Sequence, residues 1–232
     1  MAIHLADLTF RSQRRQGVDF ADITIGRCNF DNCSIRDSRI SRIHAHGNKC
    51  WSCDFHNIVV EDSVIDGLAA TIESGGGKRM PIYIWGGRFK HVVLRGRIGS
   101  LLLNQPYDWV DRKPWPKEGL DEHRTYYKDI DWALDISNAA FTSVPSLRFA
   151  PPVDLIRTNP AHQAVVTRRA ASSGSWRDLD IGVWSVVIEG MLRNPWPDGV
   201  VLAAAMGGRE IDKELSGLKV LHEAGIAERW GG

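Results

Sequence analysis

Apolar residues recur at every fifth position in the first third of the chain. Stepping by five from Phe20, ten consecutive residues are uncharged and most are large and apolar. These centre positions are Phe20, Ile25, Phe30, Ile35, Ile40, Ala45, Cys50, Phe55, Val60 and Ile65. A second column, two residues before each centre, is small or apolar throughout: Val18, Ile23, Cys28, Cys33, Ser38, Ile43, Asn48, Cys53, Ile58 and Ser63. A helix repeats about every 3.6 residues and a strand about every two, so a period of five fits neither element alone. The pattern indicates instead a structure built from repeated units of five residues.

The repeat resembles that of the pentapeptide-repeat proteins, whose loose consensus is Ala-(Asp/Asn)-Leu-X-X. The triplets at residues 18–20, 28–30 and 53–55 carry the resemblance most clearly, as Val-Asp-Phe, Cys-Asn-Phe and Cys-Asp-Phe. The resemblance implies a mainly β fold, a right-handed quadrilateral β-helix with one pentapeptide per side and four per coil. It also implies that both columns point inward and that residues twenty apart stack, as Cys33 over Cys53. The position before the centre departs from the consensus, with Thr24, Arg39 and Lys49 among the replacements.

The five-residue phase returns after interruptions. It reappears in Ile82–Ile84, Gly87–Phe89 and Val92–Leu94, and again in Leu134–Ile136 and Ala139–Phe141. We therefore predict one interrupted solenoid over residues 18–67, about 82–103 and about 132–148. The glycine-rich stretch at 74–77 is predicted as a loop, and 105–131 as a larger excursion without helical or strand period. Residues 1–17 are the candidate amino-terminal cap, with Leu5, Leu8 and Phe10 as its apolar part.

A different module is predicted for residues 151–232, after a β-helical domain over residues 1–150. Apolar residues at helical spacing predict helices over Arg177–Arg193 and Arg209–Ala224. Pro151–Arg157 is predicted as a strand, and Val200–Leu202 as either strand or helix. We expect an α/β or α-helical module that caps the carboxy-terminal end of the solenoid. The stripe of Ile211, Leu215, Leu218 and Leu221, or that of Trp184, Val187 and Ile188, would cover this end or form the module's own core.

Charge and cysteine usage limit the classes of partner. Lys and Arg total 29 and Asp and Glu total 28, so a dedicated nucleic-acid or membrane binder is not expected. No signal-peptide pattern opens the sequence, which leads us to expect a cytoplasmic protein with reduced thiols. We also expect a bacterial source. Four cysteines fall in the inward columns, namely Cys28, Cys33, Cys50 and Cys53. We expect them to pack in the core, and we expect no metal and no cofactor.

Two segments are candidates for a binding surface. Residues 74–107 contain six basic residues and no acidic ones. Of these, Arg88, Lys90 and Arg95 are expected to point outward, as a basic ridge for phosphate or an acidic protein surface, or as an ordinary solvated face. The 105–131 excursion interleaves carboxylates with aromatic residues that include Trp109, Trp115 and Tyr126. These aromatics would form a ligand or partner surface, or fold back onto the solenoid wall.

No catalytic constellation is visible, although His123 lies among carboxylates and is the best single acid–base candidate. We therefore expect a non-catalytic protein-binding or adaptor protein that uses the β-helical surface. The first alternative is an enzyme or small-ligand binder with a site between the excursion and the C-terminal module. The second is a DNA mimic that binds type II topoisomerases, as some pentapeptide-repeat proteins do. That function requires an acidic rod, whereas residues 1–65 carry eight acidic and eight basic side chains.

Overall fold

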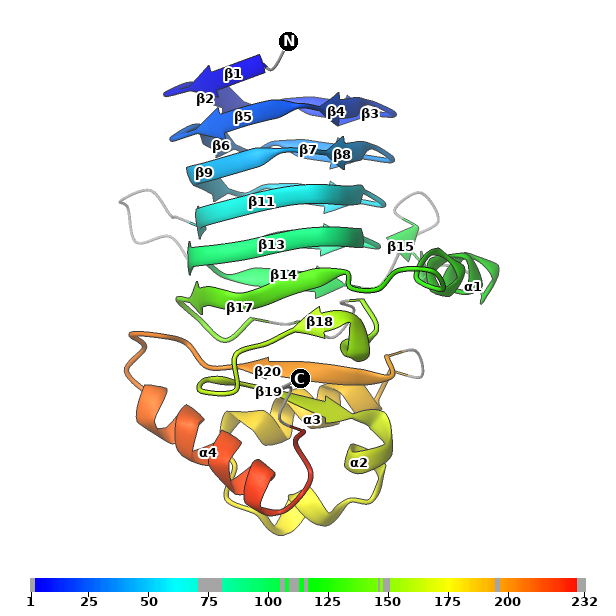
Figure 1. Cartoon of the computed structure of the whole chain (residues 1–232), viewed down its shortest axis with the longest axis vertical. Helices are drawn as coiled ribbons and strands as arrows, with labels where there is room; N and C mark the ends of the chain where they lie inside the picture. The colour runs from blue at the N-terminus through cyan, green and yellow to red at the C-terminus, as the bar shows by residue number, and fades with distance from the viewer. Residues whose placement is uncertain are drawn as a thin grey trace.

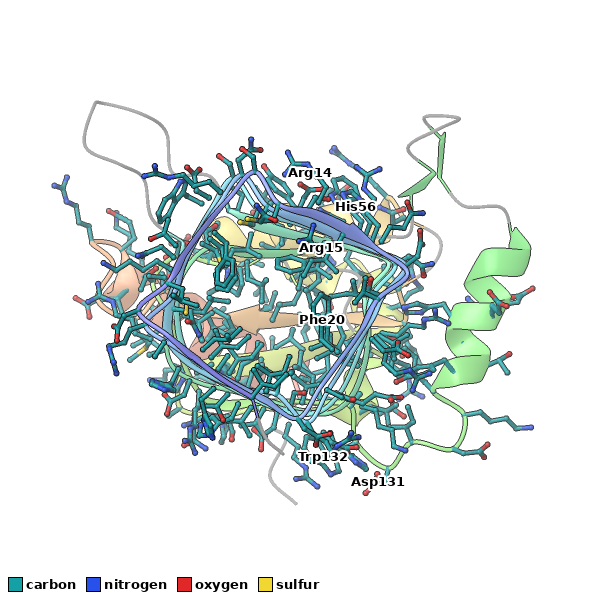
Figure 2. The ribbon with its side chains drawn as sticks, turned by 90° about the horizontal axis from the view of Figure 1, so that it is seen from above. Arg14, Arg15, Phe20, His56, Asp131 and Trp132 are labelled. Carbon is teal, nitrogen blue, oxygen red and sulfur yellow. The ribbon has the colours of Figure 1, made fainter. Side chains whose placement is uncertain are left out.

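A computed structural model describes residues 3–70, 81–104, 107–108, 113–114, 117–145, 147, 151–194 and 197–228. The prediction of a mainly β chain is confirmed, with parallel sheets and some helices. Figure 1 shows successive strands stacked as rungs along the long axis, with most of the helices gathered at one end. Seen from above in Figure 2, the rungs trace a four-sided outline. We call this stack the coil.

Short strands form the sides of the coil. They are β1 (Ile3–Ala6), β2 (Thr9–Arg11), β3 (Arg14–Gln16), β4 (Asp19–Ala21), β5 (Ile23–Gly26), β6 (Asn29–Asp31), β7 (Ser34–Arg36), β8 (Arg39–Ser41), β9 (His44–Trp51), β10 (Asp54–His56), β11 (Val59–Ala70), β12 (Ile82–Trp85), β13 (Arg88–Ile98), β14 (Leu101–Asn104), β17 (Leu134–Phe141) and β18 (Ile156–Arg157). One eleven-stranded sheet has the main order β1-β5-β9-β11-β13-β17-β18, joined by β2, β4, β6 and β8. A five-stranded sheet has the order β14-β12-β10-β7-β3.

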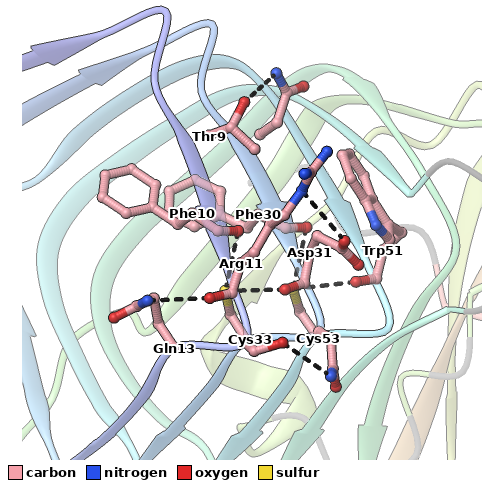
Figure 3. A network of polar contacts seen from close by, with 12 residues as sticks. Thr9, Phe10, Arg11, Gln13, Phe30, Asp31, Cys33, Trp51 and Cys53 are labelled. Carbon is pink, nitrogen blue, oxygen red and sulfur yellow. Dashed lines mark hydrogen bonds and ion pairs between the residues drawn. The ribbon is translucent and has the colours of Figure 1, made fainter.

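The register between neighbouring rungs is twenty residues in the first three coils. Ile3 pairs with Ile23, and Phe10 pairs with Phe30, whose ring stacks on it at 5.1 Å. The thiols of Cys33 and Cys53 each donate to a main-chain carbonyl of the rung before, at 3.5 and 3.4 Å (Figure 3). Residues twenty apart in the inward columns therefore lie on neighbouring rungs.

The corners of the coil use left-handed backbone. Positive φ recurs every fifth residue, at Asp7, Ser12, Gly17, Asp22, Arg27, Asn32, Asp37, Arg42, Gly47, Ser52, Asn57 and Asp62. Asn, Asp and Gly tolerate this conformation best, which explains their frequency two residues after each centre. Corner side chains also bond between rungs, since Arg27 pairs with Asp7 at 2.6 Å and Arg42 pairs with Asp22 at 2.6 Å.

The predicted amino-terminal cap is wrong for residues 3–17. These residues form β1, β2 and β3, which pair with β5, β6 and β7 and so make the first coil. Leu5 and Phe10 belong to the centre column, whereas Leu8 is 42% exposed. The column continues upstream of Phe20 through Arg15, whose charge interrupts the apolar period.

The excursion at 105–131 contains a helix, contrary to the prediction. Strands β15 (Tyr107–Asp108) and β16 (Lys113–Pro114) pair antiparallel, and α1 follows over Lys117–Tyr126. Glu, Leu, Lys and Arg favour a helix here, but so few residues are apolar that no amphipathic stripe is visible in the sequence.

The C-terminal module combines a two-stranded ribbon with helices. Its elements are η1 (Val153–Leu155), β19 (Gln163–Thr167), α2 (Arg168–Ser172), η2 (Ser175–Asp178), α3 (Val183–Leu192), β20 (Gly199–Ala203) and α4 (Ile211–Glu223). The predicted second helix is confirmed as α4, and Val200–Leu202 is a strand. The predicted helix over Arg177–Arg193 starts only at Val183, because Gly182 has a φ of 54°. The predicted strand over Pro151–Arg157 is mostly a 3-10 turn, with only its last two residues in β18.

The antiparallel ribbon of β19 and β20 separates two cores. Val165 and Val201 pack with the last rungs of the coil, whereas Val166 and Leu202 face the helices. Figure 1 shows the ribbon lying across the end of the coil below β18. Both candidate stripes, on α3 and α4, pack inside the module. The coil is thus covered by a ribbon rather than by a helix.

Candidate functional site

The outer face of the five-stranded sheet carries a regular grid of side chains. On β7, β10 and β12 the residues on either side of each inward centre point outward, because side chains alternate along a strand. The register places Ser34, Asp54 and Tyr83 in one row across the strands. Arg36, His56 and Trp85 form the second row. Three neighbouring rungs therefore present charged and aromatic groups side by side.

This grid surrounds a shallow cavity of about 460 Å³, which we call the wall groove; its lining residues are Arg36, Asp54, His56, Tyr83 and Trp85. The rings of Tyr83 and Trp85 lie 6.2 Å apart and within 13° of parallel. His56 is parallel to Trp85 within 3°, at 6.5 Å, and only 7% exposed. Figure 2 places His56 on the outer side of the four-sided outline. The groove therefore has an aromatic side and a charged side.

Hydrogen bonds fix the charge of Asp54 at the floor of the groove. Ser34 Oγ donates to Asp54 Oδ2 at 3.0 Å, and His56 Nε2 also contacts Asp54 Oδ2. Although burial opposes ionisation, the bonds from His56 and Ser34 hold the pKa of Asp54 below its usual range. Asp54 is therefore an ionised carboxylate with two partners inside the fold.

The three residue types of a hydrolytic triad occur here in a different arrangement. The hydroxyl of Ser34 bonds to the carboxylate of Asp54 and not to the imidazole of His56. A serine nucleophile requires an adjacent base to take its proton. Ser34 is also buried, with 3% exposure, so its oxygen does not face a substrate. The geometry favours binding over acyl transfer.

The excursion is anchored to the coil next to the predicted basic residues. Arg88 lies 5.6 Å from the Tyr126 ring, whose hydroxyl donates to Glu61 Oε1 at 3.0 Å. Burial raises the pKa of Tyr126, so it stays a donor at neutral pH. Tyr127 accepts the Phe89 main-chain N–H at 3.0 Å. Tyr126 and Tyr127 thus pack against the wall, which is the second of the two outcomes considered for the excursion's aromatics.

The other predicted binding residues are not gathered into one site. Arg95 pairs with Asp66 at 3.0 Å, and Lys90 stands opposite Glu61 in the strand register. Trp109 and Trp115 lie outside the described residues. The structure thus brings together Arg88 and Tyr126 but places Arg95 in a separate ion pair.

His123 and the cysteines are in packed surroundings. His123 Nε2 lies 3.3 Å from the Gly87 carbonyl, and burial lowers the pKa of the imidazole. All four cysteines are free and buried, and burial raises the pKa of the Cys33 thiol. Within the described ranges, no three His, Cys, Asp or Glu side chains are grouped so as to hold a metal ion. Nor do these ranges contain a helix with the length and apolar character needed to cross a membrane.

A second polar cluster joins the excursion to the coil. His91 bonds to Asp62 at 3.0 Å through Nδ1 and to Asp131 at 2.7 Å through Nε2. The hydrogen bond to Asp131, followed by that to Asp62, raises the pKa of His91. The Trp132 ring lies 4.9 Å from His91, tilted by 36°, and the Arg157 guanidinium lies over the Trp132 ring at 4.3 Å. This cluster connects β11, β13, the end of the excursion and β18.

The wall groove was missed in the sequence, although a signal for it exists. Arg36 and His56 are twenty residues apart, so they fall in one outward column of the repeat. Trp85 follows twenty-nine residues later, because the segment between β11 and β12 adds nine residues to that coil. Reading the outward columns as well as the inward ones would have aligned Arg36 with His56. Comparison with known proteins supplies no further assignment, since no protein-family model and no curated protein matches the chain.

Proposed function

We propose that the coil is a right-handed quadrilateral β-helix of the pentapeptide-repeat type. The twenty-residue register, the four-sided outline and the left-handed corner at every fifth residue support this assignment. A wall of this kind offers flat, rigid sheets on which outward side chains keep fixed spacings.

We propose that the protein is a non-catalytic binding protein that takes a partner protein in the wall groove. The observation that carries this proposal is the grouping of Tyr83, Trp85 and Arg36 around one concave site. Tyrosine, tryptophan and arginine are the residues most enriched at the energetic centres of protein interfaces. Shallow, open geometry suits a partner's surface better than an enclosed small molecule.

The charges of the groove define the segment that it recognises. Asp54 is held by contacts with Ser34 and His56, and the charge of Arg36 also lowers its pKa, but Arg36 makes no ion pair within the described residues. A partner segment therefore places a carboxylate on Arg36 and an apolar or aromatic side chain on Tyr83 and Trp85. The four free, buried thiols support a reducing compartment, as in the cytoplasm.

The proposal is tested by comparing two surfaces of the same chain. Partners are captured from an extract of the source organism on immobilised protein, quantified by mass spectrometry, and then purified for titration. The double variant R36E/Y83S is expected to weaken binding of the captured partner at least tenfold. The matched variant K90E/R95E, on the adjoining sheet, is expected to leave it unchanged. Equal binding to R36E/Y83S and wild type, or loss in K90E/R95E alone, would show that the partner uses another surface.

A further inference from the structure

We infer that the end of the coil farthest from the module binds a single-chain fatty acid. The acyl chain enters the apolar interior of the coil, and its carboxylate pairs with Arg15. This site lies at the top of Figure 1, on the first rung, and is separate from the wall groove.

The first coil forms a four-sided mouth. Its four sides supply one inward centre residue each, namely Leu5, Phe10, Arg15 and Phe20. Arg15 is aligned with Ile35 and then with Phe55, which places it in the inward column. Figure 2 shows Arg15 and Phe20 inside the outline and Arg14 outside it. Apolar rings and one guanidinium therefore frame the same opening.

An apolar interior lies directly below this mouth. A cavity of about 320 Å³ is lined by the mouth residues and by the second coil. It shares six lining residues with a further cavity of about 210 Å³, which extends to Leu134 on β17; the shared residues are Ile25, Phe30, Cys33, Ile35, Ile40 and Ile43. Apolar cavities of about 150 Å³ already stay dry and bind benzene. The interior thus offers space for a hydrocarbon chain along the axis of the coil.

Arg15 supplies the polar end of the site. It is the one charged residue in the centre column from Leu5 to Ile65. Its guanidinium donates to the Arg14 carbonyl at 3.0 Å and to Gln13 Oε1 at 3.1 Å, and it pairs with no carboxylate within the described residues. A guanidinium binds a carboxylate through two parallel hydrogen bonds. An exposed cation at the rim of an apolar cavity matches an amphiphile with an anionic head.

Size and charge select a fatty acid over other occupants. The upper cavity is at the lower limit of ligand sites, about 300 Å³, which fits one chain rather than the two of a phospholipid. A second copy stacked on this mouth by a two-fold axis would bring two Arg15 side chains together, and like charges repel.

The experiment is a calorimetric titration of the full chain with saturated fatty acids of increasing length, below their micellar concentrations. Affinity is expected to rise about fourfold per added methylene until the cavity is filled. Arg15→Gln is expected to weaken fatty-acid binding at least about tenfold and to leave binding of the matching alcohol unchanged. Arg14→Gln is the matched control, because Arg14 neighbours Arg15 but lies outside the outline, and it should bind as wild type does. Circular dichroism spectra of both variants are compared with that of wild type to check that the fold is kept.

Several results would overturn the inference. The first is the lack of saturable binding at any chain length. The second is an equal loss of affinity in Arg14→Gln and Arg15→Gln, which would indicate general charge attraction. The third is equal binding to phosphatidylglycerol vesicles by wild type and Arg15→Gln, together with no binding of free fatty acid, which would indicate adsorption to lipid surfaces. Light scattering that shows a dimer whose formation fatty acid does not inhibit would assign the mouth to a second copy.

Discussion

Replacing Gln163 by methionine should lower stability by removing the hydrogen bonds of one side chain that links the coil to the module. Gln163 is 1% exposed and lies where β19 crosses the end of the coil. Its Nε2 donates to the Ile136 carbonyl at 2.9 Å and lies 3.5 Å from the Ala139 carbonyl. Its Oε1 accepts the Asn159 main-chain N–H at 2.9 Å. Methionine keeps the length of the side chain but removes these hydrogen bonds.

The magnitude follows from the groups left without a partner. The two bonds at 2.9 Å are the strong ones, and each buried group that loses its partner costs about 1–3 kcal/mol. We therefore expect Q163M to lower the free energy of unfolding by about 2–6 kcal/mol. In a chain of this size each kcal/mol lost from the free energy of unfolding lowers Tm by about 2–4 °C.

Urea unfolding followed by circular dichroism and tryptophan fluorescence measures this effect. The matched control is Q16M, at an exposed glutamine whose side chain donates to a surface carboxylate, Asp37, at 3.0 Å. That change should stay within about 0.5 kcal/mol of wild type. A loss below about 1 kcal/mol in Q163M, or one no larger than in Q16M, would refute the assignment of Gln163 as the polar link between coil and module.

Three further predictions concern the module, the excursion and the core. Gly217→Ala should lower Tm although alanine favours helices, because the new Cβ would lie 2.7 Å from the Trp184 ring; a raised Tm would contradict this packing. Because bonding to Asp131 raises the folded-state pKa of His91, its contribution to stability is present below the unfolded pKa and lost as pH rises through the folded one. Urea unfolding from about pH 6 to 9 should show this loss of stability, which we expect to stay below about 1 kcal/mol because the cluster is exposed. His91→Gln should abolish the pH dependence. The four cysteines, each at most 8% exposed, should react slowly with a thiol reagent under native conditions, and rapid labelling would count against the inward columns.

The inward columns of the coil could be predicted because burial constrains them directly. A five-residue side brings the same position inward on every rung, so the period is visible from Phe20 onward without any structure. The first rung was missed because Arg15 occupies its centre column, at a mouth where a charged group still reaches water. The apolar period exists because the centre positions are buried, so it is lost at positions that are exposed to solvent.

The wall groove and the cover of the coil depend on contacts that no local period encodes. Trp85 pairs with His56 although twenty-nine residues separate them, so no column of constant spacing in the sequence connects the two. In the module, the helical stripes of α3 and α4 are read correctly as apolar, but the sequence does not say which core they enter. The ribbon of β19 and β20 has buried residues on both faces. Its strands therefore lack the alternation of apolar and polar residues that identifies a strand with one solvent-exposed face.

The fixed register of the coil has a consequence for how this chain can change in length. A residue added within a side would turn every later inward side chain of that strand toward the outer face. Insertions are therefore tolerated where one strand has ended and the next has not begun, as in the segments between β11 and β12 and between β14 and β17. A whole rung of twenty residues, by contrast, adds or removes one complete layer and leaves its neighbours paired as before. The unit by which such a chain can lengthen or shorten without disturbing its neighbours is therefore one whole layer, which pairs with the edge of the layer beneath it.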